Sequence, residues 1–134
     1  MLSVILIFFF MSSLRAEASD IFRLTLSSMK PEKRVQQALQ VKDDTLWIQE
    51  KSFSLKNRPI YVLGAGKAAA RMAAGTESVL KSYLHDGLVI GPEKQGNASR
   101  QEASLERIQL FSGTHPKPDE SSLASTLELI KLAK

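Results

Sequence analysis

The sequence predicts an α/β fold, a Rossmann-like parallel sheet flanked by helices, on three observations. A short apolar run at Ile60–Leu63 stops at Gly64-Ala65-Gly66, and an alanine-rich helical segment follows. A second short apolar run, at 88–90, and a third predicted strand, at 107–111, precede another helical segment. Strands that alternate with crossover segments in this order form a parallel sheet. Because no strand follows the last helix, we expect the incomplete amino-terminal part of a larger doubly wound domain.

The first forty-odd residues read as two helices. Apolar positions at helical spacing predict an amphipathic helix over Leu14–Met29. Pro31 suits the first turn of a second helix, over 31–40, with Val35, Ala38 and Leu39 facing inward. The polar pair Asp43-Asp44 then ends the helical region.

Short strands and one long helix make up the middle of the chain. Residues 45–48 and 53–55 have the pattern of a hairpin. After the strand at Ile60–Leu63, periodicity predicts a helix over 67–83. The run at 88–90 follows Asp86-Gly87 and is closed by a Gly-Pro pair, so it reads as a short buried strand.

The remaining third of the chain begins with a polar stretch without periodicity. Pro92–Glu106 is therefore predicted to be a loop, and residues 107–111 the third strand of the core. Asp119 or Ser121 can cap a last helix, whose apolar side chains we expect to face inward. These side chains are Leu123, Leu127 and Ile130.

Composition describes an ordinary globular chain. The 134 residues are 43% hydrophobic and 24% charged, which excludes global disorder and allows one domain with a core. The net charge is +4, but the basic residues are scattered and do not alternate with aromatic ones, so we expect no nucleic-acid partner. With no cysteine, disulfides and thiolate metal sites are excluded, and a cytoplasmic location fits.

The amino terminus is almost wholly apolar over residues 2–11. This run is shorter than the roughly 20 residues of a membrane-spanning helix, so no membrane partner is expected. It resembles a signal peptide without a basic start, or an extension before a true start at Met11. We therefore divide the chain into residues 1–11, an extension, and 12–134, one truncated domain. If residues 2–11 act as a signal, the protein is secreted or membrane-associated.

The glycine turn carries most of the predicted chemistry. A strand–turn–helix junction presents backbone N–H groups to an anion, and Lys67 adds a positive charge there. Residues 64–69 also satisfy G-x-G-x-x-A, but the acid that holds a ribose is displaced to Glu93, beyond a Gly-Pro turn. A P-loop is excluded, since Tyr61 replaces its first glycine and Ala68 its Ser or Thr. The simpler alternative is that the glycines only let the chain turn.

A second group of polar residues, 112–122, follows the third strand. The carboxyl ends of parallel strands meet at one edge of a sheet, so this segment and the glycine turn are expected together. His115 lies between a Thr and a Pro, and it could orient or deprotonate a hydroxyl or donate to a carboxylate. The alternatives are a solvated or structural histidine, and an Asp119 that is only a helix cap.

Together these residues resemble the class II glycerate kinases, the glycerate 2-kinase family with a MOFRL domain at the carboxyl end. The resemblance runs from about Ser12 to the last residue. It rests on the opening helix with Ile21-Phe22 and Pro31, on VLGAGKAAARMA from Val62, and on THPKPDESS from Thr114. The last of these is similar to the family's His-Pro-x-Pro-Asp pattern.

The resemblance implies a kinase that uses ATP and Mg²⁺ to phosphorylate the 2-hydroxyl of D-glycerate, giving 2-phosphoglycerate. It implies a catalytic role for Lys67. Substrate or phosphate binding is implied for five other residues, namely Gly64, Ala65, Gly66, His115 and Asp119. No metal ligand is predicted here, because most ATP and Mg²⁺ contacts are expected outside this stretch. Half a site should be inactive, so we expect no kinase activity from the chain alone.

Two other functions stay open at this point. Some members of the family carry the name hydroxypyruvate reductase, and G-x-G-x-x-A would suit an NAD(P)-dependent enzyme. The other alternative is a non-catalytic module that binds an anion. In each case the expected partner is a small molecule, with a homo-oligomer possible.

Overall fold

A computed structural model describes residues 2–92 and 105–134, so most of the predicted loop at Pro92–Glu106, with Glu93, lies outside the described residues. The chain divides into two compact units, Met1–Lys30 and Pro31–Lys134.

The first unit is one helix, α1 (Leu2–Ser28). The predicted helix over 14–29 is therefore confirmed, and residues 2–11 continue it without a break. Over residues 13–28 its large apolar side chains are exposed, among them Ile21 and Phe22. In the described part of the chain, no helix combines the length and apolarity needed to cross a bilayer. A boundary at residue 11 stays a prediction.

The second unit opens with α2 (Pro31–Ala38) and a small antiparallel sheet. Its strands are β1 (Leu39–Lys42), β2 (Thr45–Ile48) and β3 (Lys51–Ser54), in the order β1-β2-β3. The predicted β2–β3 hairpin is confirmed. The predicted helix over 31–40 is wrong at its end, because 39–42 form a strand.

The turn after β1 explains that error. Asp43 and Asp44 adopt φ of 49° and 54° and connect β1 to β2 as a two-residue loop. Two positive φ angles are what a type I′ hairpin turn requires, and aspartate tolerates them. Leu39 and Val41 then alternate with exposed residues and pack against the core, as on a half-buried strand.

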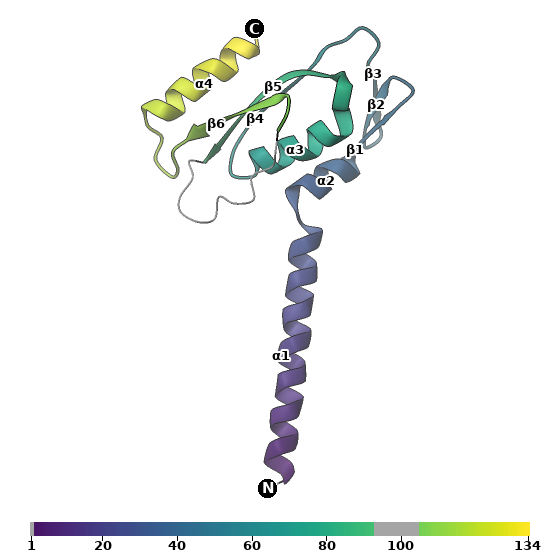
Figure 1. The fold of residues 1–134 in the computed structure, drawn as a ribbon, viewed down its shortest axis with the longest axis vertical. Helices are drawn as coiled ribbons and strands as arrows, with labels where there is room; N and C mark the ends of the chain where they lie inside the picture. The colour runs from purple at the N-terminus through teal and green to yellow at the C-terminus, as the bar shows by residue number, and fades with distance from the viewer. Residues whose placement is uncertain (1, 93–104) are drawn as a thin grey trace. The chain divides into compact units, whose positions relative to one another are not determined.

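The larger sheet is parallel and carries the predicted fold class. Its strands are β4 (Ile60–Ala65), β5 (Leu84–Pro92) and β6 (Ile108–Gly113), in the order β4-β5-β6. The connection from β4 to β5 is α3 (Ala69–Leu80), followed by the 3₁₀ turn η1 (Lys81–Tyr83). The α/β prediction with a parallel sheet is confirmed (Figure 1).

Strand β5 begins four residues before the predicted run at 88–90. Asp86-Gly87 was placed before the strand, but Gly87 lies inside it, paired with Val62 and Ile108. A Cβ on Gly87 would lie 2.9 Å from the Val62 backbone oxygen and from the Ile108 side chain. The glycine is therefore needed for close packing of three strands, which sequence alone does not distinguish from a turn.

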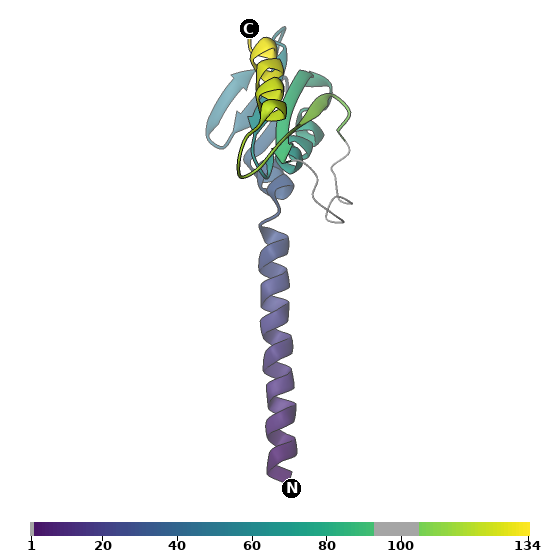
Figure 2. The same cartoon turned by 90° about the vertical axis from the view of Figure 1, so that its left-hand side faces the viewer.

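Helices cover both faces of the parallel sheet. Ala73 and Leu80 of α3 share a buried cluster with Leu84, Val89 and Ile108. The small sheet joins this cluster through its own buried leucine, so the unit has one core. The last helix, α4 (Glu120–Leu132), contacts β5 and β6 from the other face, as the two views show (Figures 1 and 2).

Helix α4 presents an unexpected face to the sheet. The apolar residues predicted to face inward, Leu123, Leu127 and Ile130, are 62%, 51% and 42% exposed, so that prediction is wrong. Ser125 is buried instead, and its hydroxyl donates to the backbone oxygen of Ser112 at 2.7 Å. This hydrogen bond to the end of β6 accompanies the partial burial of Leu129 and Leu132, which lie on the same face of α4 as Ser125.

Candidate functional site

The glycine turn is positioned by the end of β4 and the start of α3. Gly66 has a φ of 132°, which favours glycine, and its N–H donates to the Ile90 backbone oxygen at 2.9 Å. The N–H of Ala69 then donates to the Gly66 oxygen at 3.1 Å. Among the described residues, no side chain caps α3 at Ala68. The helix therefore begins with N–H groups that could donate hydrogen bonds to an anion next to Lys67.

The loop after β6 is fixed by hydroxyl groups. The N–H of Thr114 donates to the Ser122 Oγ at 3.0 Å, and the Thr114 hydroxyl donates to the Lys117 backbone oxygen at 2.9 Å. The side-chain oxygens of Thr114 and Ser122 lie 3.2 Å apart. These bonds join the loop that carries His115 to the first turn of α4.

Asp119 is the N-cap of α4, one of the two caps that the sequence predicted. Its carboxylate accepts from the Ser121 hydroxyl at 2.7 Å and from the Ser122 N–H at 3.1 Å. These two bonds, that of Ser121 first, lower the pKa of Asp119 to about 2. The carboxylate is thus oriented toward the helix that it caps.

A cavity of about 340 Å³ lies where these segments meet, at the carboxyl edge of the parallel sheet. Lining residues come from the glycine turn, the end of β5, the loop after β6 and α4. They are Ala65, Gly66, Lys67, Ile90, Gly91, Pro92, Gly113, Thr114, His115, Pro118, Ser122 and Thr126. We call this the carboxyl-edge cavity.

Four of the six predicted site residues line this cavity: Ala65, Gly66, Lys67 and His115. Gly64 does not line it. It lies in β4, where an added Cβ would touch the Val89 side chain at 3.4 Å. Asp119 does not line it either. Direct contact of these two residues with a ligand stays a prediction.

Sequence reasoning did not single out the hydroxyl groups of the cavity. Thr114, Ser122 and Thr126 all line it, and the first two also hold the loop. Thr114 and Ser122 stand at the two ends of the segment THPKPDESS, which was the available signal. No sequence motif pointed to Thr126, because its position in the cavity depends on which face α4 turns to the sheet.

The donor set of the cavity suits an anion better than a cation. Its charged group is the amine of Lys67, joined by an imidazole and hydroxyls, and among the described lining residues there is no Asp or Glu. In the described ranges, 2–92 and 105–134, no three His, Cys, Asp or Glu side chains gather as metal ligands. These residues do not fit Mg²⁺, which prefers carboxylate oxygens.

Comparison with known proteins places the chain in a family. The family profile described as "Domain of unknown function (DUF4147)" matches residues 17–134. The chain belongs to the DUF4147 family. The match includes both the glycine turn and the His115 loop.

Relatives of this DUF4147 chain are named glycerate kinases, which confirms the resemblance drawn from its motifs. Glycerate kinase of Bos taurus is 31% identical over 132 residues, covering 91% of this chain and 25% of that protein. Glycerate 2-kinase of Pyrococcus horikoshii is 31% identical over 107 residues, covering 80% and 22%. The DUF4147 chain thus spans about a quarter of the length of the curated relatives that it matches.

Solved structures share the fold of the DUF4147 chain. A crystal structure of a Pyrococcus horikoshii OT3 protein superposes with a TM-score of 0.71 and 28% identity, covering 89% of this chain and 25% of that one. Glycerate kinase from Thermotoga maritima superposes with a TM-score of 0.63 and 23% identity, covering 90% and 25%. At that identity the second likeness concerns the fold alone.

Proposed function

We propose that this chain supplies one wall of the active site of an ATP-dependent glycerate kinase, which phosphorylates the 2-hydroxyl of D-glycerate. The names of the relatives support the kinase reaction and its substrate. The observation that carries the proposal is that Lys67 and His115 line one cavity at the carboxyl edge of the sheet. Ligands of open α/β sheets bind at this edge.

Lys67 meets negative charge in this proposal. Its amine stands beside a helix start without a side-chain cap, where it opposes the helix dipole unless an anion is present. The carboxylate of D-glycerate, or the phosphoryl group in transit, would supply that anion. Neutralising and orienting these oxygens is how proteins catalyse phosphoryl transfer.

His115 brings an imidazole to the cavity, and an imidazole nitrogen can take a proton from a reacting hydroxyl. The glycerate 2-hydroxyl oxygen forms a bond to the γ-phosphorus of ATP, the bond from that phosphorus to the ADP oxygen breaks, and the hydroxyl proton leaves to a base. We assign that base role to His115. The products are 2-phosphoglycerate, ADP and a proton.

Magnesium does not enter this part of the proposal, because the lining residues do not fit it. For the same reason we propose that the 134-residue chain has no kinase activity alone. Incubation of the purified chain with ATP, Mg²⁺ and D-glycerate should give no 2-phosphoglycerate above a blank. Robust turnover would refute the proposal that this chain holds only part of the active site.

A chimera tests the kinase proposal itself. Residues 17–134 would replace the matching quarter of the Pyrococcus horikoshii glycerate 2-kinase, and circular dichroism would confirm folding. We expect the chimera to form 2-phosphoglycerate and Lys67→Ala to reduce kcat/KM at least a hundredfold. Arg71→Ala is the matched control, since this exposed cation lies one helical turn away and does not line the cavity.

The same chimera distinguishes the kinase proposal from the hydroxypyruvate reductase alternative. With NADH and hydroxypyruvate in place of ATP and D-glycerate, the kinase proposal predicts no oxidation of the cofactor. Oxidation of NADH together with an inactive kinase assay would replace the proposal by that alternative.

A further inference from the structure

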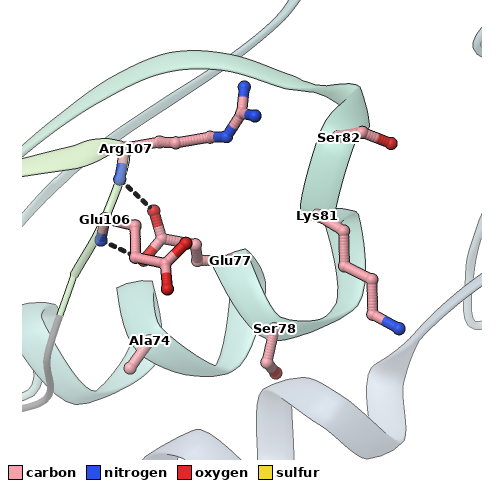
Figure 3. Close-up of a pocket in the computed structure, with 7 residues that line it drawn as sticks. All are labelled: Ala74, Glu77, Ser78, Lys81, Ser82, Glu106 and Arg107. Atoms are coloured by element: carbon pink, nitrogen blue, oxygen red, sulfur yellow. Dashed lines mark hydrogen bonds between the residues drawn. The ribbon is translucent and has the colours of Figure 1, made fainter.

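A single carboxylate binds the start of β6. The Glu77 side chain, in α3, accepts hydrogen bonds from three successive backbone N–H groups, those of Glu106 at 2.9 Å, Arg107 at 2.5 Å and Ile108 at 3.1 Å. Figure 3 shows this carboxylate pointing from α3 at the backbone of Glu106 and Arg107. A second cavity, of about 420 Å³, lies beside these bonds.

A second bond holds the same place from β5. The guanidinium of Arg107 donates through Nη1 to the backbone oxygen of Leu84, the first residue of β5, at 3.1 Å. The entry to β6 is therefore attached to α3 through Glu77 and to β5 through Arg107.

These bonds can determine the register in which β6 pairs with β5. The connection from β5 to β6 is long, spanning residues 93–107, so no short turn sets how β6 pairs with β5. A slip by one residue would turn every β6 side chain to the opposite face of the sheet. A carboxylate that binds three N–H groups at the bend before Ile108 favours a single register, because successive N–H groups inside a strand point in alternating directions and cannot converge on one acceptor.

The two elements joined by Glu77 carry opposite walls of the carboxyl-edge cavity. Helix α3 follows the turn of Gly66 and Lys67, and its first residue, Ala69, lies about 12 Å from Glu77 along the helix at 1.5 Å per residue. Strand β6 runs from Ile108 to Gly113, about 17 Å at 3.3 Å per residue, and ends where His115 is carried. The distance between Lys67 and His115 thus depends on how far β6 slides along α3.

We propose that Glu77 is a positioning residue, which sets the place of the His115 loop relative to Lys67 through the register of β6. Its importance for catalysis rests on the proposed function. The effect on geometry does not, and it is measurable in this chain without a ligand.

Two measurements on the folded 134-residue chain test this. Amide hydrogen exchange of 106–108 should be slow in the wild type and at least tenfold faster in Glu77→Ala. Backbone amide resonances of Gly113, Thr114 and His115, at the far end of β6, should shift in Glu77→Ala. Glu77→Gln keeps one carbonyl acceptor, so it should lie between the wild type and the alanine variant in both measurements.

Two controls separate positioning from stability. Glu106→Ala removes a carboxylate from the same cavity and should leave residues 113–115 unchanged. Leu55→Ala removes a buried side chain of the core and should destabilise the chain without shifting those resonances. If Leu55→Ala shifts them as much as Glu77→Ala does, the positioning role is overturned.

The inference also fails if Glu77→Ala leaves the exchange of 106–108 unchanged, or if these amides exchange in the wild type as fast as an exposed loop. This second test uses only the wild type, so it can refute the inference even if no Glu77 variant folds. A chimera without kinase activity would refute the proposed function and would leave these measurements intact.

Discussion

The backbone N–H of Thr114 donates to the hydroxyl oxygen of Ser122 at 3.0 Å, which joins the His115 loop to the first turn of α4. Ser122→Ala leaves this partly buried N–H without its acceptor, so we expect a loss of about 1–3 kcal/mol in the free energy of unfolding. Urea denaturation measures it. Ser121→Ala is the matched control, because that exposed hydroxyl bonds only the Asp119 carboxylate among the described contacts. Equal losses in the two variants would contradict this role for Ser122.

Acid should weaken the cap of α4 only at very low pH. The pKa of Asp119 falls from 3.8 to about 2 because the Ser121 hydroxyl and the Ser122 N–H bond its ionised form. The cap therefore contributes stability that is fully present above pH 4 and is lost as pH falls through about 2. Carboxyl ¹³C NMR of Asp119 against pH gives the midpoint.

The Ser121→Ala variant shows whether that cause is correct. It removes the larger contribution, so the Asp119 midpoint should move up toward the ordinary value. A wild-type midpoint near 3.8, or one that Ser121→Ala does not move, would be inconsistent with the capping geometry.

Helices α2 and α3 are in close contact at Gly75. A Cβ placed there would lie 2.5 Å from the Glu32 backbone oxygen, and no rotamer change can relieve a contact with backbone. Gly75→Ala should cost about 1–3 kcal/mol of stability from overpacking, offset by up to about 1 kcal/mol of helix propensity. Thermal unfolding measures the net effect, with Thr76→Ala as the neighbouring control. A stabilised Gly75→Ala variant would exclude the close contact.

High pH should weaken the tie between η1 and the β1–β2 turn. The Tyr83 hydroxyl donates to the Asp44 carboxylate at 2.7 Å, and this bond raises the pKa of Tyr83 above 10. The bond stabilises the fold fully below pH 10, and this contribution is lost as pH rises through the raised pKa. Ultraviolet titration in a Tyr61→Phe background leaves Tyr83 as the one tyrosine. Asp44→Asn should lower its midpoint, and an unchanged midpoint would argue against the bond.

The parallel sheet was predictable because its strands are short, mainly apolar runs and a helical segment lies between the first two. The convergence of Lys67 and His115 was predictable for a related reason, since parallel strands end at one edge. Both inferences depend on local pattern and on a general rule of topology. Neither requires knowledge of any particular side-chain contact.

Three features could not be predicted, each because a contact distant in sequence decides it. Gly87 reads as a turn residue until Val62 and Ile108 are found on either side of it. The face of α4 that meets the sheet carries Ser125, bonded to Ser112, and is not the face that Leu123, Leu127 and Ile130 indicate. Glu77 is an ordinary helix-surface residue in the sequence, and only the path of β6 reveals its three donors.

Titration of the ¹⁵N-labelled chain with D-glycerate, followed by NMR, tests the central claim most directly. An anion bound between the glycine turn and the His115 loop should shift the amide resonances of Gly66, Lys67, Thr114 and His115 the most. Lys67→Ala should weaken this binding at least tenfold, while Arg71→Ala leaves it unchanged. Shifts confined to other parts of the chain, or equal binding by the Lys67→Ala variant, would contradict the account.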